Sequence, residues 1–192
     1  MKLIFSGKVS DEFIHRVIEI SLRLKVNPNY LMACMAFESD ETFSSTITNY
    51  AGSGAVGLIQ FMPNTAIAMG TTSKMLSDMT AEKQLNFVEK YFSPYKERLD
   101  TLEDTYMAIL YPAAIGKPND YVLFRRDDIK HPKQYRQNNR LDFNKDGIII
   151  KAEAAAAVRQ KYDKGIGTKD DPEFDLDEYF KIYEPRGLEL IK

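Results

Sequence analysis

The sequence contains one cysteine, no tryptophan and no strong excess of either charge. Among its 192 residues, 26 are Lys or Arg and 28 are Asp or Glu, which gives a formal net charge of −2. A nearly neutral chain has no global basic field that would attract nucleic acid or anionic lipid. Cys34 alone can form neither an intrachain disulfide nor a two-cysteine metal site. We therefore expect a protein that can fold in reducing cytosol and has no nucleic-acid partner.

Long hydrophobic runs are also absent. Runs such as Leu31 to Phe37 are far shorter than the roughly 20 apolar residues that span a bilayer. The first residues lack the apolar core of a signal peptide. We expect a soluble monomer with no leader peptide and no membrane insertion. The 44% apolar content provides for one well-cored domain with a small appendage.

The residues that are present predict a mainly helical fold. Ser10 can cap a helix over residues 11–24, because acidic residues follow it and apolar residues then recur at helical spacing. Asn27 followed by Pro28 is a second helix start, and the segment up to Glu38 is apolar on all sides, as in a helix at the centre of a domain. Further helices are expected at Pro63 to Gly70, Ala81 to Tyr95 and Leu102 to Tyr111.

Glu38 closes the central apolar helix and is the first candidate for chemistry. Burial disfavours the charged form of a carboxyl group, so a Glu in this setting is a candidate general acid with a raised pKa. The alternative is a Glu that merely ends the helix in solvent. The segment Gly54 to Pro63, about twenty residues later, has flexible glycines followed by a polar amide among apolar side chains. Such a loop could close over an extended neutral ligand.

The same glycines also match a dinucleotide-binding fingerprint. Gly52, Gly54 and Gly57 have the required spacing, and Asp78 follows at the distance of a ribose-binding acid. That fingerprint must open a long helix that packs on a parallel sheet, and Pro63 would interrupt the helix. We therefore set the nucleotide interpretation aside.

Three motifs in this region resemble the soluble-type lytic transglycosylases, which share a lysozyme-like helical fold with goose-type lysozyme. They are Glu38-Ser39, the segment from Gly57 to Pro63 with Thr65-Ala66, and Ala108 to Tyr111, although Pro112 follows Tyr111 where the family usually has Asn-Ala-Gly. The resemblance covers roughly residues 10–125 and implies a peptidoglycan-cleaving enzyme with Glu38 as its catalytic acid and base. It also implies glycan contacts for Ser39, Gln60, Phe61, Met62 and Tyr111. Aromatic candidates for sugar stacking are Phe61, Tyr50 and Tyr106.

The distribution of carboxylates bears on the reaction. Glycoside hydrolysis normally requires two carboxylates, and residues 42–77 contain no Asp or Glu. Only Asp40, Glu41 or an acid distant in sequence could be the second. The resemblance implies a one-carboxylate mechanism in which Glu38 protonates the glycosidic oxygen and then takes the proton of the sugar's 6-hydroxyl, giving a 1,6-anhydro product. Lysozyme-type hydrolysis remains the alternative.

A second motif lies outside this region. Residues 142–153 match the twelve-residue calcium loop of an EF-hand, with Gly147 at the sharp turn and a helix-forming segment after the loop. The expected entering segment, residues 132–141, is polar and a doubtful helix. A charged turn that caps an ordinary helix is the alternative. The predicted Ca²⁺ ligands are Asp142, Asn144, Asp146, the carbonyl of Ile148, and Glu153.

Together these features predict a mainly α, lysozyme-like catalytic domain over residues 1–130. The C-terminal extension, residues 131–192, would pack on the same domain and carry a structural calcium loop. Because the resembled enzymes cut cell walls and no leader peptide is evident, we expect a bacteriophage endolysin. Such an enzyme is made in the host cytoplasm, or carried in the virion, and acts on peptidoglycan. A non-catalytic calcium-binding phage structural or wall-binding protein is the alternative of another class.

Overall fold

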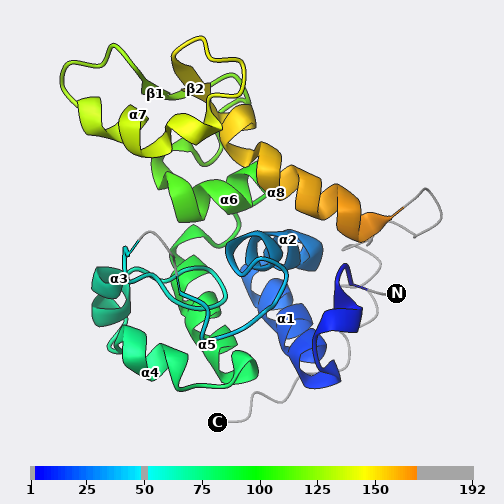
Figure 1. Cartoon of the computed structure of the whole chain (residues 1–192). Helices are drawn as coiled ribbons and strands as arrows, with labels where there is room; N and C mark the ends of the chain where they lie inside the picture. Colours follow the sequence, from blue (N-terminus) through cyan, green and yellow to red (C-terminus); the bar gives the residue numbers. More distant parts are fainter. Residues whose placement is uncertain (1–2, 49–51, 168–192) are drawn as a thin grey trace.

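The structure is a computed structural model that describes residues 3–48 and 52–167. These residues form a mainly helical protein, as the sequence predicted (Figure 1). The α-helices of this part of the chain are α1 (Asp11–Leu24), α2 (Pro28–Glu38), α3 (Pro63–Ala68), α4 (Ser73–Ser77), α5 (Ala81–Phe92), α6 (Leu102–Leu110), α7 (Pro132–Asn138) and α8 (Lys151–Ile166).

The first two helices begin where their capping residues predict. The hydroxyl of Ser10 accepts a hydrogen bond from the backbone N–H of Phe13 at the start of α1, and the side chain of Asn27 accepts one from Asn29 at the start of α2. Each bond satisfies a backbone donor that the first helical turn leaves free. Pro28 occupies the first turn of α2, where its missing N–H costs nothing.

Helix α2 lies at the centre of the molecule. Helices α1, α6 and α8 all contact it, and eight of its residues are buried. This surrounds the apolar helix on all sides, which is the arrangement that its sequence predicted. The tyrosines of α2 and α8, Tyr30 and Tyr162, meet with ring centroids 5.7 Å apart. The segment from residue 151 to 166 is thus part of the wall around the central helix.

A small antiparallel sheet, which sequence reasoning missed, joins the region after α6 to the C-terminal part of the chain. Strand β1 (Val122–Arg125) pairs with β2 (Ile148–Ile150), and α7 contacts β1 (Figure 1). The division expected near residue 130 falls between these two paired strands. Part of the predicted calcium loop, residues 142–153, belongs to this sheet, because β2 lies within the loop.

A buried ion pair fixes α8 to α6. The ammonium of Lys151 lies 2.6 Å from a carboxylate oxygen of Asp104, and both side chains are less than a tenth exposed. Lys151 also donates a hydrogen bond to the carbonyl of Lys117, and Asp104 accepts one from the N–H of Gly116. A buried charge that loses its partner costs about 3–5 kcal/mol, so these contacts hold α8 firmly once they are formed.

None of the helices in residues 3–48 and 52–167 has both the length and the apolar content that crossing a bilayer requires.

Candidate active site

Glu38 lies at the last position of α2, where the apolar helix ends. Its side chain is partly buried, and burial raises the pKa of its carboxyl group from 4.5 to about 7. The carboxyl makes no hydrogen bond or ion pair with any residue that the structure describes. A carboxylic acid that is half protonated near neutral pH can both donate and accept a proton, as a general acid and base must.

Two tyrosines lie close to this carboxyl group. Burial raises the pKa of Tyr91 to about 12, with smaller contributions from Tyr95 and Glu38, and burial together with the charge of Glu38 moves that of Tyr106 well above its ordinary value. The hydroxyl of Tyr91 donates a hydrogen bond to the carbonyl of Ala108, 3.0 Å away, and the ring of Tyr106 meets that of Phe37 edge-on. Both phenols therefore stay neutral and form the wall beside the acid. Sequence analysis did not find Tyr91, since no local motif marks it.

Ser39 has a different environment from the one that the resemblance implies. Its side chain is fully buried. The hydroxyl donates a hydrogen bond to the carbonyl of Met35 and accepts one from the N–H of Phe43. Ser39 therefore orders the chain that follows α2, and in this structure its hydroxyl does not face solvent.

Asp40 and Glu41 were the sequence candidates for a second carboxylate. Asp40 is directed outward, with its side chain 88% exposed. Glu41 lies within 2.7 Å of the ammonium groups of Lys8, Lys161 and Lys164. Hydrogen bonds from these lysines hold the pKa of Glu41 far below its usual range. Glu41 is thus ionised and paired, and it joins the end of α2 to α8.

The loop from Gly57 to Phe61 is held by a residue that sequence analysis missed. The side-chain oxygen of Gln84, which is fully buried on α5, accepts a hydrogen bond from the N–H of Leu58 at 2.7 Å. The amide nitrogen of Gln84 donates to the carbonyls of Ser45 and Leu76. Gly57 has φ +81°, and a Cβ there would lie 2.2 Å from Gln84. Only glycine fits this close approach.

The other expected glycan contacts of this loop divide into exposed and buried side chains. Gln60 has φ +52°, and its amide nitrogen lies 3.2 Å from the carbonyls of Ile47 and Gly57. Met62 is about half exposed. Phe61 is buried and packs against Tyr91, which leaves it no open face for a sugar. The stacking candidate Tyr106 is buried as well, and Tyr50 lies outside the described residues.

Tyr111 follows the last residue of α6 and is partly buried. Its ring meets that of Phe124 on β1 edge-on, with centroids 5.4 Å apart. Pro112 begins a short 3-10 helix, Pro112–Ala114, so the chain turns directly after Tyr111. This contact links the end of α6 to the small sheet.

Comparison with protein families decides what this arrangement is. The profile of the transglycosylase SLT domain matches residues 16–111, which is half of the chain. The chain belongs to the transglycosylase SLT family. Members of this family are lytic transglycosylases of the lysozyme-like superfamily that act on peptidoglycan, so the family and the mainly helical, lysozyme-like fold class predicted from the sequence are confirmed. No curated protein matches the chain.

The SLT match begins at residue 16 within α1, continues through α6 and ends at Tyr111. It therefore includes Glu38, the loop with Gln60 and the two tyrosines beside the acid. It does not include α8, although α8 contacts α2 and α6 of the SLT domain.

The predicted calcium loop lies beyond the matched residues. The backbone N–H groups of the loop donate to its side chains: Gly147 to Asp142, Asp146 to Asn144, and Ile148 to Asp146. The last ligand candidate, Glu153, accepts a hydrogen bond from the N–H of Ile150 and caps the start of α8. In the described residues no three or more His, Cys, Asp or Glu side chains gather closely enough to hold a metal ion.

One atom of the loop nevertheless fits a cation. One carboxylate oxygen of Asp142 accepts hydrogen bonds from Tyr135 and Gly147, whereas the other, Oδ1, is buried and has no hydrogen-bond partner in the described residues. A buried carboxylate oxygen without a partner is costly. The doubtful entering segment is helical, as α7 followed by the 3-10 helix Asn139–Leu141, and Ile149 is fully buried.

Proposed function

We propose that the protein cleaves the β-1,4 bond between N-acetylmuramic acid and N-acetylglucosamine in peptidoglycan, with Glu38 as general acid and then general base. The observation that carries the proposal is the setting of Glu38, whose carboxyl group is partly buried, has a pKa of about 7 and is free of partners in the described residues. The protonated carboxyl would donate to the glycosidic oxygen, and the carboxylate would then accept a proton.

The surroundings of Glu38 favour a non-hydrolytic outcome. Burial is the only cause that raises the pKa of Glu38, so no described carboxylate is close enough to add to it. The nearest candidates in sequence are turned outward, as Asp40 is, or bound by lysines, as Glu41 is. With one carboxylate, Glu38 would take the proton of the substrate's own 6-hydroxyl, while the N-acetyl group assists at the anomeric carbon. The product would be a 1,6-anhydromuramic end.

Substrate contacts are proposed for those implied glycan-binding side chains that are not fully buried. Gln60 and Met62 lie on the loop that Gln84 anchors, and Tyr111 lies at the end of α6. The resemblance implies glycan binding for both places, the loop and the end of α6. Ser39 and Phe61 would act through the shape of the site, because their side chains are buried.

Product analysis tests the reaction. Purified sacculi digested in heavy-oxygen water should yield muropeptides that are one water lighter than hydrolysis products and carry no isotope. Products with reducing ends and one heavy oxygen would instead identify a lysozyme-type hydrolase. No product at all, together with retained binding to sacculi, would favour a non-catalytic wall-binding protein.

For the C-terminal region, we propose that the loop of residues 142–153 binds a structural Ca²⁺. Support comes from the unpartnered Oδ1 of Asp142 and from the oxygen-rich ligand set of Asp142, Asn144, Asp146, Ile148 and Glu153. To bind bidentately, Glu153 would have to leave the N–H of Ile150. The ion would hold the loop against β1 and would have no part in proton transfer.

The substrate makes the bacterial cell wall the place of action. A bacteriophage endolysin remains the role that we predict, and a monomer the predicted state.

A further inference from the structure

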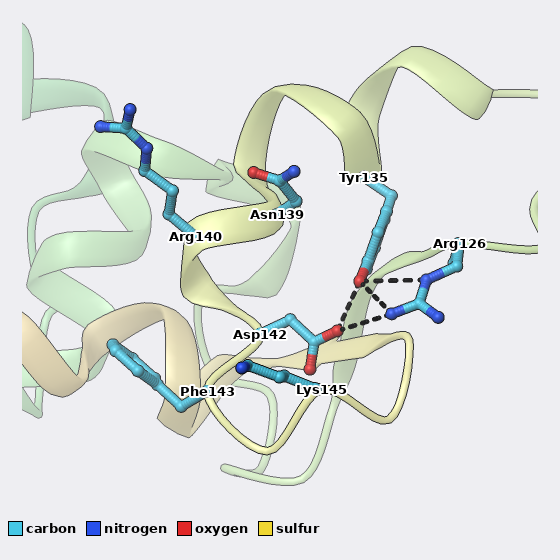
Figure 2. A pocket seen from close by; sticks show the side chains of 7 residues that line it. All are labelled: Arg126, Tyr135, Asn139, Arg140, Asp142, Phe143 and Lys145. Atoms are coloured by element: carbon cyan, nitrogen blue, oxygen red, sulfur yellow. Dashed lines mark hydrogen bonds and ion pairs between the residues drawn. The ribbon is translucent and has the colours of Figure 1, made fainter.

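The cavity in Figure 2 belongs to the proposed calcium loop, because Asp142, Phe143 and Lys145 form part of its wall. It therefore adds no separate site. The turn of residues 39–43 lies elsewhere, directly after Glu38 at the end of α2. Its backbone has an unusual conformation that neither the catalytic proposal nor the calcium proposal uses.

The turn closes α2 with a Schellman motif. The N–H of Glu41 donates to the carbonyl of Ala36 at 2.7 Å, and the N–H of Asp40 donates to that of Phe37 at 3.3 Å. Such a closure usually has glycine in the left-handed position after the helix, because a side chain there is strained. Here Asp40 occupies it with φ +49°, and Glu41 follows with φ +60° and Phe43 with φ +50°. Left-handed residues of this kind persist only where the rest of the fold holds them.

Segments from both ends of the described chain support the turn. Three ammonium groups bind the carboxylate of Glu41 within 2.7 Å, those of Lys8, Lys161 and Lys164. The side chain of Glu41 is only 9% exposed. The ring of Phe43 is buried, and its centroid lies 6.0 Å from that of Phe5 and 5.9 Å from that of Phe13. The conformation of the turn therefore depends on contacts with residues far away in sequence.

The carboxyl group of Glu38 has no polar partner in the described residues that would fix its direction. The ionisable groups that face it from α2, α5 and α6 are the thiol of Cys34 and the phenols of Tyr91 and Tyr106, and burial raises the pKa of all three. These groups are neutral and do not bind the carboxyl. Its direction is therefore set by packing and by the backbone, which the turn closes.

We infer that Glu41 is a positioning residue for the proposed reaction: its carboxylate, bound by the three lysines, keeps the turn closed and so fixes where the carboxyl of Glu38 lies. The inference rests on the proposed function. Glu41 would touch no substrate and would act through the backbone. Because Lys161 and Lys164 lie on α8, this helix would contribute to catalysis although it lies outside the SLT match.

The carboxylate of Glu41 also offsets the charge of the lysines. Without it only Asp40 would remain beside them, and its carboxylate is 88% exposed and lies 3.7 Å from Lys161. A loosened turn would at the same time admit water to Glu38. Both changes favour the ionised form of a carboxyl group, so the pKa of Glu38 should fall when Glu41 loses its charge.

The test compares Glu41→Gln with a matched control on soluble glycan strands. The control is Glu103→Gln. The Glu103 carboxylate lies 2.7 Å from Arg159 on α8 and is 13% exposed, so its loss also loosens α8 but removes no contact of the turn. A third variant adds Asp40→Gly to Glu41→Gln, because glycine adopts the left-handed conformation without strain. All values of kcat and KM are taken where circular dichroism shows that the variant is folded.

We expect Glu41→Gln to lose about tenfold to a hundredfold in kcat with KM nearly unchanged, since a misplacement of about 1 Å can cost a hundredfold. The pH above which kcat falls should move down from about 7. Adding Asp40→Gly should restore a large part of kcat, and Glu103→Gln should lose stability only. Carbon NMR of isotope-labelled glutamates, with Glu38→Gln for assignment, should show the same downward shift in the pKa of Glu38.

The inference is overturned if Glu41→Gln keeps the wild-type kcat and pH profile. An equal loss of kcat in Glu103→Gln would also overturn it, because that result would mean a general loosening of α8. If Glu41→Gln does not fold, Glu41→Asp, with the charge on a shorter side chain, should show a smaller loss of kcat. A wild type that cuts no glycan would instead refute the proposed function, and the NMR titration would still decide whether Glu41 controls the surroundings of Glu38.

Discussion

The carboxylate of Glu41 lies 2.7 Å from the ammonium of Lys161, which is 120 residues later in the chain. Glu41 is only three residues after Glu38, so this contact ties the last helix to the end of the helix that carries the proposed catalytic acid. Lys8 and Lys164 bind the same carboxylate. The sequence offered Glu41 as a possible second acid, whereas its pairing gives it the task of holding the site together.

This cluster predicts a pH-dependent contribution to stability. The pKa of Glu41 is lowered in the folded protein, so its contribution is present above the ordinary value of 4.5 and is lost as the pH falls below it. Glu41→Gln should therefore lower the melting temperature at pH 7, and the difference from wild type should shrink in acid. Asp40→Asn gives the comparison, because the carboxylate of Asp40 is 88% exposed and lies 3.7 Å from the same Lys161, and an exposed pair of this kind contributes far less than the Glu41 cluster. Equal melting temperatures of Glu41→Gln and wild type at pH 7 would show that the cluster contributes nothing.

A second prediction concerns Glu38. Glu38→Gln should reduce wall lysis by at least about 10²–10⁴, because the amide cannot transfer a proton. Wild-type activity should fall as the pH rises through about 7, where Glu38 loses the proton that the first step needs. Turbidity loss of sacculi across pH measures both effects, and activity above a tenth of wild type in the variant would refute the assignment.

A third prediction is that the raised pKa of Glu38 affects the stability of the fold, with a pH dependence opposite to that of Glu41. A carboxyl with a raised folded pKa favours the native state fully below its unfolded value of about 4.5, and this advantage is lost as the pH rises through about 7. Above pH 7 the Gln variant should thus be more stable than wild type, by about 1–3 kcal/mol. Urea unfolding of both proteins at pH 5 and pH 8.5 would measure this. If the difference in the free energy of unfolding between the variant and wild type is the same at both pH values, Glu38 is not a buried acid with a raised pKa.

Gln84 provides a fourth prediction, on the loop. Gln84→Ala leaves the N–H of Leu58 and the carbonyls of Ser45 and Leu76 without their partner in a buried place. We expect a loss of about 2–4 kcal/mol in the free energy of unfolding. Activity should fall as well, because the loop carries Gln60. The exposed Gln137→Ala is the control, and a similar small loss in both variants would mean that the loop does not need its anchor.

The calcium proposal gives the fifth prediction. A ligand that binds only the native state stabilises it by about 2.7 kcal/mol at a hundredfold excess over Kd, so calcium should raise the melting temperature of chelator-treated protein. Glu153→Gln should erase most of this shift. Its side-chain oxygen can still accept from Ile150, so the helix cap survives, whereas Glu153→Ala would lose both. If calcium changes neither the melting temperature nor the heat of titration, the loop is an ordinary turn.

The sequence predicted those parts of the fold that local signals determine. The starts of α1, α2 and α3 follow from Ser10, Asn27 and Pro63, whose capping or proline chemistry acts within a few residues. The pairing of β1 with β2 could not be found in this way, because the two short strands lie more than twenty residues apart and neither has a clear alternating pattern.

In the candidate site, too, the residues with a local sequence signal could be predicted, and those that the fold brings together could not. Glu38 was found because a lone acid at the end of an apolar helix is a local signal. Gln84 and Tyr91 lie on α5, outside every motif, and matter only because the fold brings them to the loop and to the acid. Ser39 was predicted from its motif as a glycan contact, which stays a prediction, and the motif does not reveal that its hydroxyl is buried and bonded to Met35 and Phe43.

The contact of α8 with α2 has a consequence for protein engineering. A fragment that ends at Tyr111, with the family match, would leave the surface of α2 that α8 covers open to water. Its Asp104 would also lose the ammonium of Lys151 inside the protein. Exposed apolar helix surface of this kind promotes aggregation. Chimaeric wall-degrading enzymes built from this chain should therefore carry the last helix along with the matched residues.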